Sequence, residues 1–365
     1  MPHINRVTLE NYKSIRRADL ALSGLDVLIG LNGSGKSNLL SFFSLLGHVR
    51  TGNLQGFVQI RSGGAASLLH CGPTKSPTMS WRVELDRDTW HNVYSATLAY
   101  SADDSLVFQN ELVEARRQDQ SVGVQVPLES SSRESRMNDP SVTSQANVRA
   151  VWTSMRDARY FQFHNTSFTS RIRQRRDAEP AFQLHDDGGN LAAFLMRLRE
   201  DATGSYEQIR AACREVIPWF DDFALNDGAD GKAGLTRLAI RERSGEMFAS
   251  HQISDGSLRF FALAALLCQP VGMSPDFLCI DEPELGLFPA ALSKLADLML
   301  RRKEEGVQVL LATQSRDLLR YLNVDPIVAE RKPSAWSETV FRTLSPAELD
   351  MWYDEYTQGD EQERR

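Results

Sequence analysis

The sequence predicts an α/β protein with two lobes. Short runs that alternate polar and apolar residues recur between residues 57 and 113, separated by turn-rich segments, which is typical of an antiparallel sheet. After residue 250, apolar strands alternate with helical segments, and this order is typical of a parallel sheet. We therefore expect a β-rich first lobe of mixed or antiparallel strands over residues 1–168. A second lobe of helices and parallel strands should span residues 169–356, followed by a disordered tail at 357–365.

The first lobe should open with two strands and a helix. Val7 and Leu9 alternate with polar neighbours over residues 6–10, and the apolar run 25–29 is a second strand. A helix is expected from residue 36 to 46, with Gly47 as its C-terminal stop. The segment 118–147 is polar and weakly patterned, which predicts a mobile excursion. Further strands are expected at residues 81–85, 95–100, 105–108 and 159–164.

The second lobe should contain the βα units. Ser345 and Glu348 frame a capping box with proline at the first helical position, so a last helix should begin there. Strands are expected at residues 277–282 and 307–313, and helices at 190–200, 206–216, 258–268 and 289–303.

Composition limits the classes of partner. A net charge of −7 argues against a protein that coats nucleic acid over its whole surface, so any such contact needs a local patch or a partner. No apolar run approaches the roughly 20 residues that span a bilayer, and the N-terminus does not resemble a signal peptide. The four cysteines form no CxxC pair, which favours free thiols in a reducing compartment. We expect a cytoplasmic protein without a membrane partner.

A glycine-rich loop predicts a nucleoside triphosphate site. Residues 30–37 match the pattern GxxxxGK[ST] between an expected strand and an expected helix. Glycines let backbone N–H groups face the phosphates, Lys36 reaches the β- and γ-phosphates, and the Ser37 hydroxyl ligates Mg²⁺. A chance glycine turn is the alternative, and the flanking strand and helix argue against it. The residues expected to bind the nucleotide are Gly30, Asn32, Gly33, Ser34, Gly35, Lys36, Ser37 and Asn38.

An acidic pair follows a buried strand. The apolar run 277–280 leads into Asp281 and Glu282. Asp281 is placed to hold Mg²⁺ through water, and Glu282 to polarise the attacking water as general base. A surface turn with two acids is the alternative. Glu284 is left open between a helix cap and a solvated charge.

The third motif is Ser254-Asp255-Gly256-Ser257, at the start of an apolar segment. Ser254 would cap the helix and Gly256 permits close backbone approach, so this helix start is an anion site. A plain N-cap is the alternative. Its position just before the acidic strand favours the binding hypothesis.

Two weaker features complete the list of candidates. Gln314 ends the strand 307–313, where it could sense the γ-phosphate or orient water; a polar strand end is the alternative. The run 171–176 contains four arginines and is the best candidate for a nucleic-acid footprint, with an exposed basic turn as the alternative.

Together these motifs resemble the RecF/SMC/OLD-like ABC ATPases, and especially bacterial stand-alone ATPases that are labelled AAA family although their motifs are of the ABC type. The resemblance covers most of the chain. It rests on residues 11–15, 30–38, 160–167, 189–195, 254–260, 281–287 and 313–315.

The resemblance implies an ABC-type P-loop ATPase head that uses ATP and Mg²⁺ and forms a homodimer around ATP. Lys36, Glu282 and Gln314 would then be catalytic, and Ser37 and Asp281 would bind the metal. Work in DNA repair, chromosome handling or phage defence is implied, with DNA and a separate nuclease or effector protein as further partners. Ser254, Asp255, Gly256 and Ser257 would complete the site of the other subunit in trans.

The chain departs from the group at two positions. Phe288 follows Leu287, where the group usually has histidine, and Gln314 replaces the switch histidine of many ABC ATPases. These departures motivate an alternative, a nucleotide-gated interaction module with little turnover. A transporter ATPase subunit is a third hypothesis, and the 245 residues from Lys36 to Asp281 argue against it. His164 or Asn165 is the candidate for the loop that links the lobes.

Overall fold

The structure is a computed structural model that describes residues 3–87, 89–120, 123–128, 131–155, 158–174, 176–177, 182–225, 235–332, 337–345 and 347–353. Two compact units divide the chain. The N-terminal unit contains Pro2–Met155, Leu310–Gln314 and Asn323–Arg365, and the helical unit contains Arg156–Val309 and Ser315–Leu322. The chain therefore changes unit before the lobe boundary expected at residue 168, because the first strand after residue 155 pairs within the helical unit.

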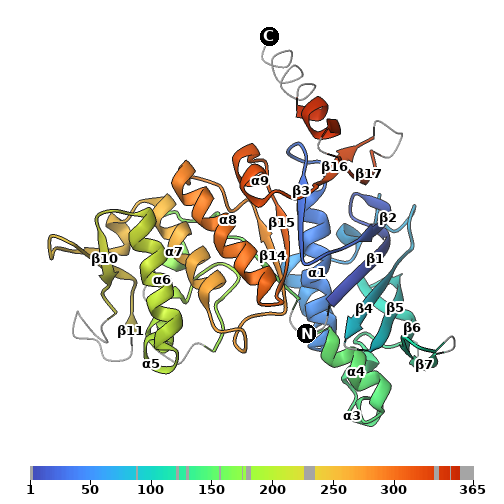
Figure 1. The fold of residues 1–365 in the computed structure, drawn as a ribbon. Helices are drawn as coiled ribbons and strands as arrows, with labels where there is room; N and C mark the ends of the chain where they lie inside the picture. Colours follow the sequence, from blue (N-terminus) through green and yellow to red (C-terminus); the bar gives the residue numbers. More distant parts are fainter. Residues whose placement is uncertain are drawn as a thin grey trace. The chain divides into compact units, whose positions relative to one another are not determined.

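A six-stranded antiparallel sheet dominates the N-terminal unit, in the order β2-β1-β4-β5-β6-β7 (Figure 1). Val7 lies opposite Val83, and Tyr94 lies opposite Val113; all four are buried. The antiparallel sheet predicted from the sequence is confirmed. Its strands are β1 (His3–Tyr12), β2 (Ile15–Ala21), β4 (Thr78–Arg87), β5 (Trp90–Ser101), β6 (Ser105–Arg117) and β7 (Val124–Leu128).

Helix α1 (Lys36–Arg50) packs its apolar face against this sheet. The ring of Phe42 lies 5.8 Å from that of Tyr12 and 5.9 Å from that of Trp81. The sequence predicts that Gly47 ends the helix, but in the structure Gly47 lies inside it. Buried Val49 continues the apolar face beyond the glycine, and its burial outweighs the roughly 1 kcal/mol that glycine costs in a helix. Three short helical elements follow α1. They are α2 (Leu54–Gly56), a π-helical turn at Phe57–Arg61 and a 3-10 turn at Ala66–Leu68.

The polar segment 118–147 is largely ordered where the structure describes it, so the expected mobile excursion is wrong for those residues. It contains β7, a 3-10 turn (Arg136–Asn138), α3 (Pro140–Thr143) and the start of α4 (Ala146–Ser154). The buried carboxylate of Glu111 anchors it by accepting hydrogen bonds from Ser135 Oγ at 2.5 Å, the backbone N–H of Arg136 at 3.0 Å and Tyr94 OH at 2.7 Å. Polarity here marks a buried hydrogen-bond network, which a composition argument cannot distinguish from disorder.

A second group of strands in the N-terminal unit surrounds the glycine-rich loop. Strand β3 (Leu25–Ile29) runs parallel to β16 (Ile327–Arg331), which pairs antiparallel with β17 (Thr339–Thr343). The backbone N–H of Thr313 donates to Leu28 O at 2.9 Å, so the end of β15 (Gln308–Ala312) lies beside β3. The glycine loop therefore leaves a sheet whose other strands come from the C-terminal part of the chain.

The contact from the Ser345 backbone to Glu348 that the predicted capping box requires is present, and Pro346 lies outside the described residues. The backbone N–H and Oγ of Ser345 both donate to Glu348 Oε2, at 2.8 and 2.6 Å, and residues 347–353 are helical. The expected tail at 357–365 lies outside the described residues.

The helical unit is built on two parallel strands. Strand β14 (Phe277–Asp281) is buried along its whole length and runs parallel to β8 (Ala158–Phe161), with Cys279 opposite Tyr160. The backbone N–H of Gln308 donates to Asp276 O at 2.9 Å, so β15 begins beside β14. These strands match the sequence prediction of parallel βα units.

The helices expected in the second lobe are present (Figure 1). Helix α7 is so apolar that most of its residues are buried, and Phe261 packs its ring 5.1 Å from those of both Phe220 and Phe223. The small sheet β10-β12-β13 and the pair β9-β11 were not predicted. The bounds are α5 (Leu191–Asp201), α6 (Thr203–Val216), α7 (Asp255–Cys268), α8 (Pro289–Glu304), α9 (Arg316–Leu322), β9 (Arg176–Asp177), β10 (Phe220–Phe223), β11 (Leu235–Thr236), β12 (Ala239–Glu242), β13 (Met247–Ala249) and 3-10 turns at Arg171–Arg173 and Ser250–Gln252.

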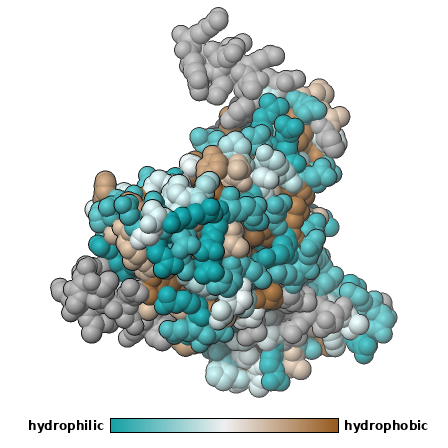
Figure 2. All heavy atoms as spheres, turned by 60° about the vertical axis from the view of Figure 1, so that its left-hand side comes forward, coloured by the Kyte–Doolittle hydropathy of each residue, from teal (hydrophilic) through white to brown (hydrophobic). Residues whose placement is uncertain are grey.

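The face drawn in Figure 2 is mostly hydrophilic, with hydrophobic residues in small separate areas. Within the described ranges, the structure contains no helix with the length and apolar character needed to cross a bilayer.

The buried carboxylate of Glu111 predicts a pH dependence of stability. Burial raises its pKa above the ordinary value of 4.5, with the hydrogen bonds from Ser135, Tyr94 and Arg136 opposing the shift. The folded chain then binds the proton more tightly than the unfolded chain, so this contribution is full below pH 4.5 and is lost as pH rises through the folded-state pKa. We expect the Glu111→Gln variant to lack this loss of folding stability with rising pH. Thermal midpoints of both proteins between pH 4 and 8 test it, with exposed Glu200→Gln as control; parallel curves for Glu111→Gln and wild type would contradict it.

Candidate nucleotide-binding site

The glycine loop has a backbone that only glycine adopts easily. Gly30 and Gly35 have φ of +148° and +109°, in the region that side chains rarely tolerate. A Cβ on Gly30 would lie 2.3 Å from Ala329 O of β16, and one on Gly35 would lie 2.3 Å from Thr339 Oγ1 of β17. The loop is therefore pressed against two C-terminal strands, and its glycines are required sterically as well as conformationally.

Lys36 and Ser34 are the two side chains held inside this loop. Lys36 is buried, and its Nζ donates to the carbonyl oxygens of Gly30 at 2.7 Å and Leu31 at 3.0 Å. Ser34 is also buried, and its Oγ has no hydrogen-bond partner among the described residues. An unpaired buried hydroxyl is costly, so a ligand that supplies its partner is the expected explanation.

Gln314 reaches the glycine loop. Its Nε2 donates to Asn32 Oδ1 at 2.7 Å, so the predicted switch residue and the loop are in direct contact within the N-terminal unit. Ser37 is exposed at the start of α1. Asn38 donates instead to Ser14 Oγ at 2.7 Å, which also accepts a hydrogen bond from Thr339 Oγ1 at 2.7 Å. Asn38 thus has a scaffolding contact, and its predicted contact with nucleotide stays a prediction.

Lys13 lies close to α1. Its Nζ donates to Ser41 Oγ at 2.9 Å, and burial lowers its pKa below the ordinary value. Its ammonium group is therefore held against α1 and is not freely solvated.

The helical unit holds Asp281 by both its side chain and its backbone. Asp281 is 2% exposed; its Oδ2 accepts a hydrogen bond from Tyr160 OH at 2.8 Å, and its backbone oxygen contacts His164 Nε2 at 3.0 Å. Its other oxygen, Oδ1, is buried without a hydrogen-bond partner in the part of the chain described. Burial and the Asp281 charge raise the pKa of Tyr160 well above its usual range, so the phenol keeps the proton that it donates. One carboxylate oxygen is thereby fixed and the other is left for a ligand.

Glu282 has a strained backbone. Its φ is +41°, in the left-handed region that non-glycine residues seldom occupy. Such strain persists only where surrounding structure enforces it, and it often marks functional positions. Here the turn that begins at Glu282 brings Gly286 against α7, where a Cβ on Gly256 would lie 2.3 Å from Gly286 O. The acidic pair and the α7 helix start therefore share one rigid corner.

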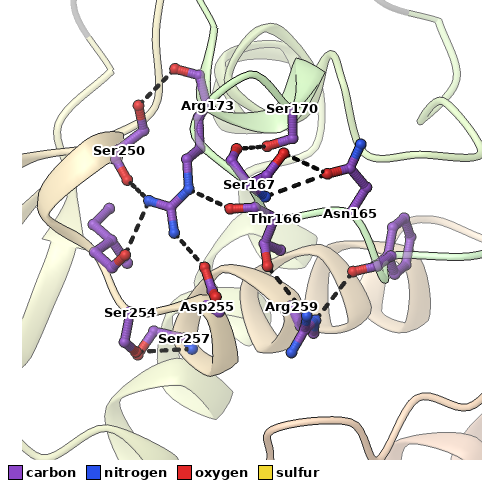
Figure 3. Close-up of polar contacts among 12 residues, drawn as sticks. Asn165, Thr166, Ser167, Ser170, Arg173, Ser250, Ser254, Asp255, Ser257 and Arg259 are labelled. Atoms are coloured by element: carbon purple, nitrogen blue, oxygen red, sulfur yellow. Dashed lines mark hydrogen bonds and ion pairs between the residues drawn. The ribbon is translucent and has the colours of Figure 1, made fainter.

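The predicted N-cap of α7 is present. Ser254 Oγ accepts a hydrogen bond from the backbone N–H of Ser257 at 3.2 Å and contacts Ser257 Oγ at 2.8 Å (Figure 3). Both Ser254 and Asp255 are exposed. The helix start is therefore accessible at the surface of the helical unit, as a site that acts on another molecule requires.

Two arginines, whose role here the sequence did not predict, hold this corner together (Figure 3). Arg259 of α7 donates to the backbone oxygens of His164 at 2.9 Å and Leu285 at 3.2 Å, and to Thr166 Oγ1 at 3.2 Å. Arg173 binds Asp255 Oδ1 at 2.5 Å and several backbone oxygens. Most of their partners lie about 80 or more residues away, and a single sequence carries no signal for such pairs.

The proposed nucleic-acid footprint at 171–176 is wrong for the residues whose side chains are described. The Arg173 side chain is only 7% exposed, and Arg171 pairs with Asp187 at 3.1 Å. Arg175 and the side chain of Arg176 lie outside the described residues. Arg173 therefore serves an internal ion pair, whereas Arg171 lies at the surface and is paired there with Asp187.

Comparison with known proteins gives the family. Residues 27–320 match the model of a family described as "AAA domain, putative AbiEii toxin, Type IV TA system". DNA replication and repair protein RecF of Salmonella typhimurium is 37% identical over 87 residues, which are 23% of this chain and 24% of that protein. Energy-coupling factor transporter ATP-binding protein EcfA of Methanocaldococcus jannaschii is 25% identical over 99 residues, 27% of this chain and 32% of that protein. The chain thus spans about a quarter of the length of the curated relatives it matches.

Solved structures show the fold. The Smc head domain with an extended coiled coil, bound to the C-terminal domain of ScpA and derived from Pyrococcus furiosus, matches with a TM-score of 0.59 and 13% identity, over 98% of this chain and 100% of that chain. The family match covers most of the chain and agrees with the loop, strand and helix geometry described above. The chain therefore belongs to this AAA-domain family, as an ABC-class P-loop ATPase with local sequence similarity to RecF and with the fold of an SMC head.

Proposed function

We propose that the chain binds ATP with Mg²⁺, forms a homodimer around it and hydrolyses it. The observation that carries this proposal is the capped start of α7, which is exposed although it has the form of an anion site. The close approach of Gly256 to Gly286 O also places this helix start beside the turn that follows the acidic pair. An ATP held by the glycine loop of a second copy is the ligand that this arrangement fits.

Two orphaned oxygen atoms support the choice of nucleotide and metal. Ser34 Oγ lies in the glycine loop and Asp281 Oδ1 at the end of β14, and both are buried without a partner among the described residues. Mg²⁺ prefers carboxylate and hydroxyl oxygens and water as ligands, and the chain offers such oxygens at the start of α1 and at the end of β14. Ser37 and Asp281 are the residues that would hold the ion. When bound, Mg²⁺ would neutralise charge on the phosphate oxygens.

The chain's own residues have distinct roles in the proposed hydrolysis. Lys36 exchanges the carbonyl oxygens of Gly30 and Leu31 for phosphate oxygens, whose charge attracts its ammonium more strongly. Glu282 accepts the proton of the attacking water, and Gln314 orients that water from its place beside Asn32. Hydrolysis removes the contacts to the γ-phosphate and so shifts the population back to monomers.

The cellular setting is proposed from the relatives. The similarity to RecF and to a family described by a toxin–antitoxin system supports DNA repair or phage defence, through DNA or through a separate nuclease or effector. Three of the four free cysteines are buried thiols, which is consistent with the cytoplasm. The gated-module alternative is motivated by Gln314 and by Phe288, which is 48% exposed. The similarity to EcfA keeps a transporter ATPase subunit as a further candidate.

Replacing the proposed general base tests the function directly. We expect Glu282→Gln to slow ATP hydrolysis by about 10²–10⁴-fold, because the attacking water loses its base, and to leave a dimer that persists with ATP. Phosphate release and light scattering measure the two effects. Exposed Glu304→Gln serves as control. Unchanged turnover in Glu282→Gln would remove Glu282 from the mechanism, and a wild-type protein that dimerises without turnover would favour the gated module.

Tyr160→Phe tests the metal site. Loss of the hydroxyl frees Asp281 Oδ2, so the carboxylate is no longer fixed for the ion. We expect the Mg²⁺ concentration for half-maximal hydrolysis to rise about tenfold, since a hydrogen bond to a charged group contributes about 1.5–3 kcal/mol. Tyr321→Phe, on exposed α9, is the control. A lower thermal midpoint with an unchanged Mg²⁺ requirement would assign Tyr160 a structural role alone.

DNA binding should depend on ATP and only moderately on salt. Because Arg173 is buried and Arg171 is already paired with Asp187, we expect few phosphate contacts; three contacts, for example, would correspond to about a 40-fold loss of affinity between 50 and 200 mM salt. Fluorescence anisotropy with a labelled duplex and Glu282→Gln measures this. Dimerisation without DNA binding at either salt concentration would point to a protein effector instead.

A further inference from the structure

The start of α7 poses an electrostatic problem for the proposed function. Asp255 is the first residue of the helix, and its side chain is 57% exposed. A carboxylate at this position interacts well with the helix dipole, but it also occupies the place where a triphosphate would be attracted. An unpaired Asp255 would therefore repel the ligand that the helix start is proposed to receive.

Arg173 resolves this conflict. Its Nη2 binds Asp255 Oδ1 at 2.5 Å, and its side chain is only 7% exposed (Figure 3). The hydrogen bond from Arg173 lowers the pKa of Asp255 against the opposing effect of partial burial, so the carboxylate stays ionised and paired. The ion pair thus removes the net charge of Asp255 from the helix start.

The guanidinium is fixed before any ligand arrives. Arg173 Nε donates to Thr166 O at 2.6 Å, and Nη1 donates to Ile253 O at 3.0 Å and to Ser250 O. In return, Ser250 Oγ donates to the backbone oxygen of Arg173 at 2.7 Å. A buried arginine with this many hydrogen-bond partners cannot change conformation to pair with another anion. It therefore stays the counter-ion of Asp255.

We propose that Arg173 is a positioning residue that neutralises Asp255 and so makes the start of α7 receptive to the γ-phosphate of ATP held by a second copy of this chain. This inference rests on the proposed function and adds a residue to it. Arg173 itself does not touch the nucleotide. It acts through Asp255 and through the backbone that leads into Ser254.

A double-mutant cycle tests the charge role, with every variant built on Glu282→Gln and association followed by light scattering against ATP concentration. We expect Arg173→Gln to raise the ATP concentration for half-maximal association about tenfold or more, because Asp255 is left unneutralised. Asp255→Asn should lower that concentration severalfold, because Arg173 then adds positive charge to the helix start. The double variant should return to within about threefold of the reference, since both charges are gone.

Controls separate this inference from the proposed function. Arg171→Gln removes a neighbouring arginine that is 50% exposed, and it should stay within about twofold of the reference. Binding of a fluorescent ATP analogue to the monomer should be unchanged in all variants, because the glycine loop belongs to the other unit. If the Glu282→Gln reference itself fails to associate with ATP, the proposed function falls and this inference with it.

Other outcomes overturn the inference alone. A double variant as weak as Arg173→Gln would mean that the arginine only holds backbone oxygens. If the thermal midpoint shows that Arg173→Gln does not fold, the Asp255→Asn variant tests the inference alone. A higher ATP concentration for half-maximal association of Asp255→Asn would refute the charge role of Arg173.

Discussion

The proposed nucleotide and metal contacts depend on two buried oxygen atoms that have no hydrogen-bond partner among the described residues. Ser34 Oγ in the glycine loop and Asp281 Oδ1 at the end of β14 lack partners among the described residues, and each such group costs about 1–3 kcal/mol. A folded protein keeps this cost only where a ligand or a mechanism needs it. The surrounding structure holds both groups in place. Thr339 packs closely against Gly35 of the glycine loop, and Tyr160 and His164 hold Asp281 by hydrogen bonds.

The parts of this site that the sequence predicts are those whose meaning lies within a few consecutive residues. The Ser254 cap bonds Ser257 three positions away, and the glycine loop is defined by its own spacing. The supports of the site are different in kind. Thr339 lies 325 positions from Ser14, and Tyr160 lies 121 positions from Asp281, so their contacts depend on how the strands are ordered. A single sequence contains no local pattern for such pairs.

The incorrect predictions share one physical cause, which is burial that overrides local composition. Gly47 would end an isolated helix, but the buried face of α1 continues past it. The polar stretch around Ser135 resembles a disordered segment, but its hydroxyl groups satisfy the buried Glu111. The run at 171–176 resembles a basic surface, but Arg173 is enclosed by backbone oxygens and Asp255. In the last two cases the polar side chains form hydrogen bonds or ion pairs inside the protein.

The proposed ATP-dependent dimer would need an energy that offers a reason for the start of α7 to be ion-paired as well as capped. A ligand shifts an equilibrium only by its difference in affinity for the two states, and moving a population from 1:99 to 99:1 takes about 5.5 kcal/mol. Shared between the two sites of a symmetric dimer, this is roughly 2.7 kcal/mol per helix start. A helix dipole at a surface contributes about 0.3–1 kcal/mol, which falls short, whereas charge-assisted hydrogen bonds contribute about 1.5–3 kcal/mol. In the proposed dimer, the serine hydroxyls and backbone N–H groups of residues 254–257 would therefore have to bind the phosphate directly, and the pairing of Asp255 with Arg173 would favour that contact.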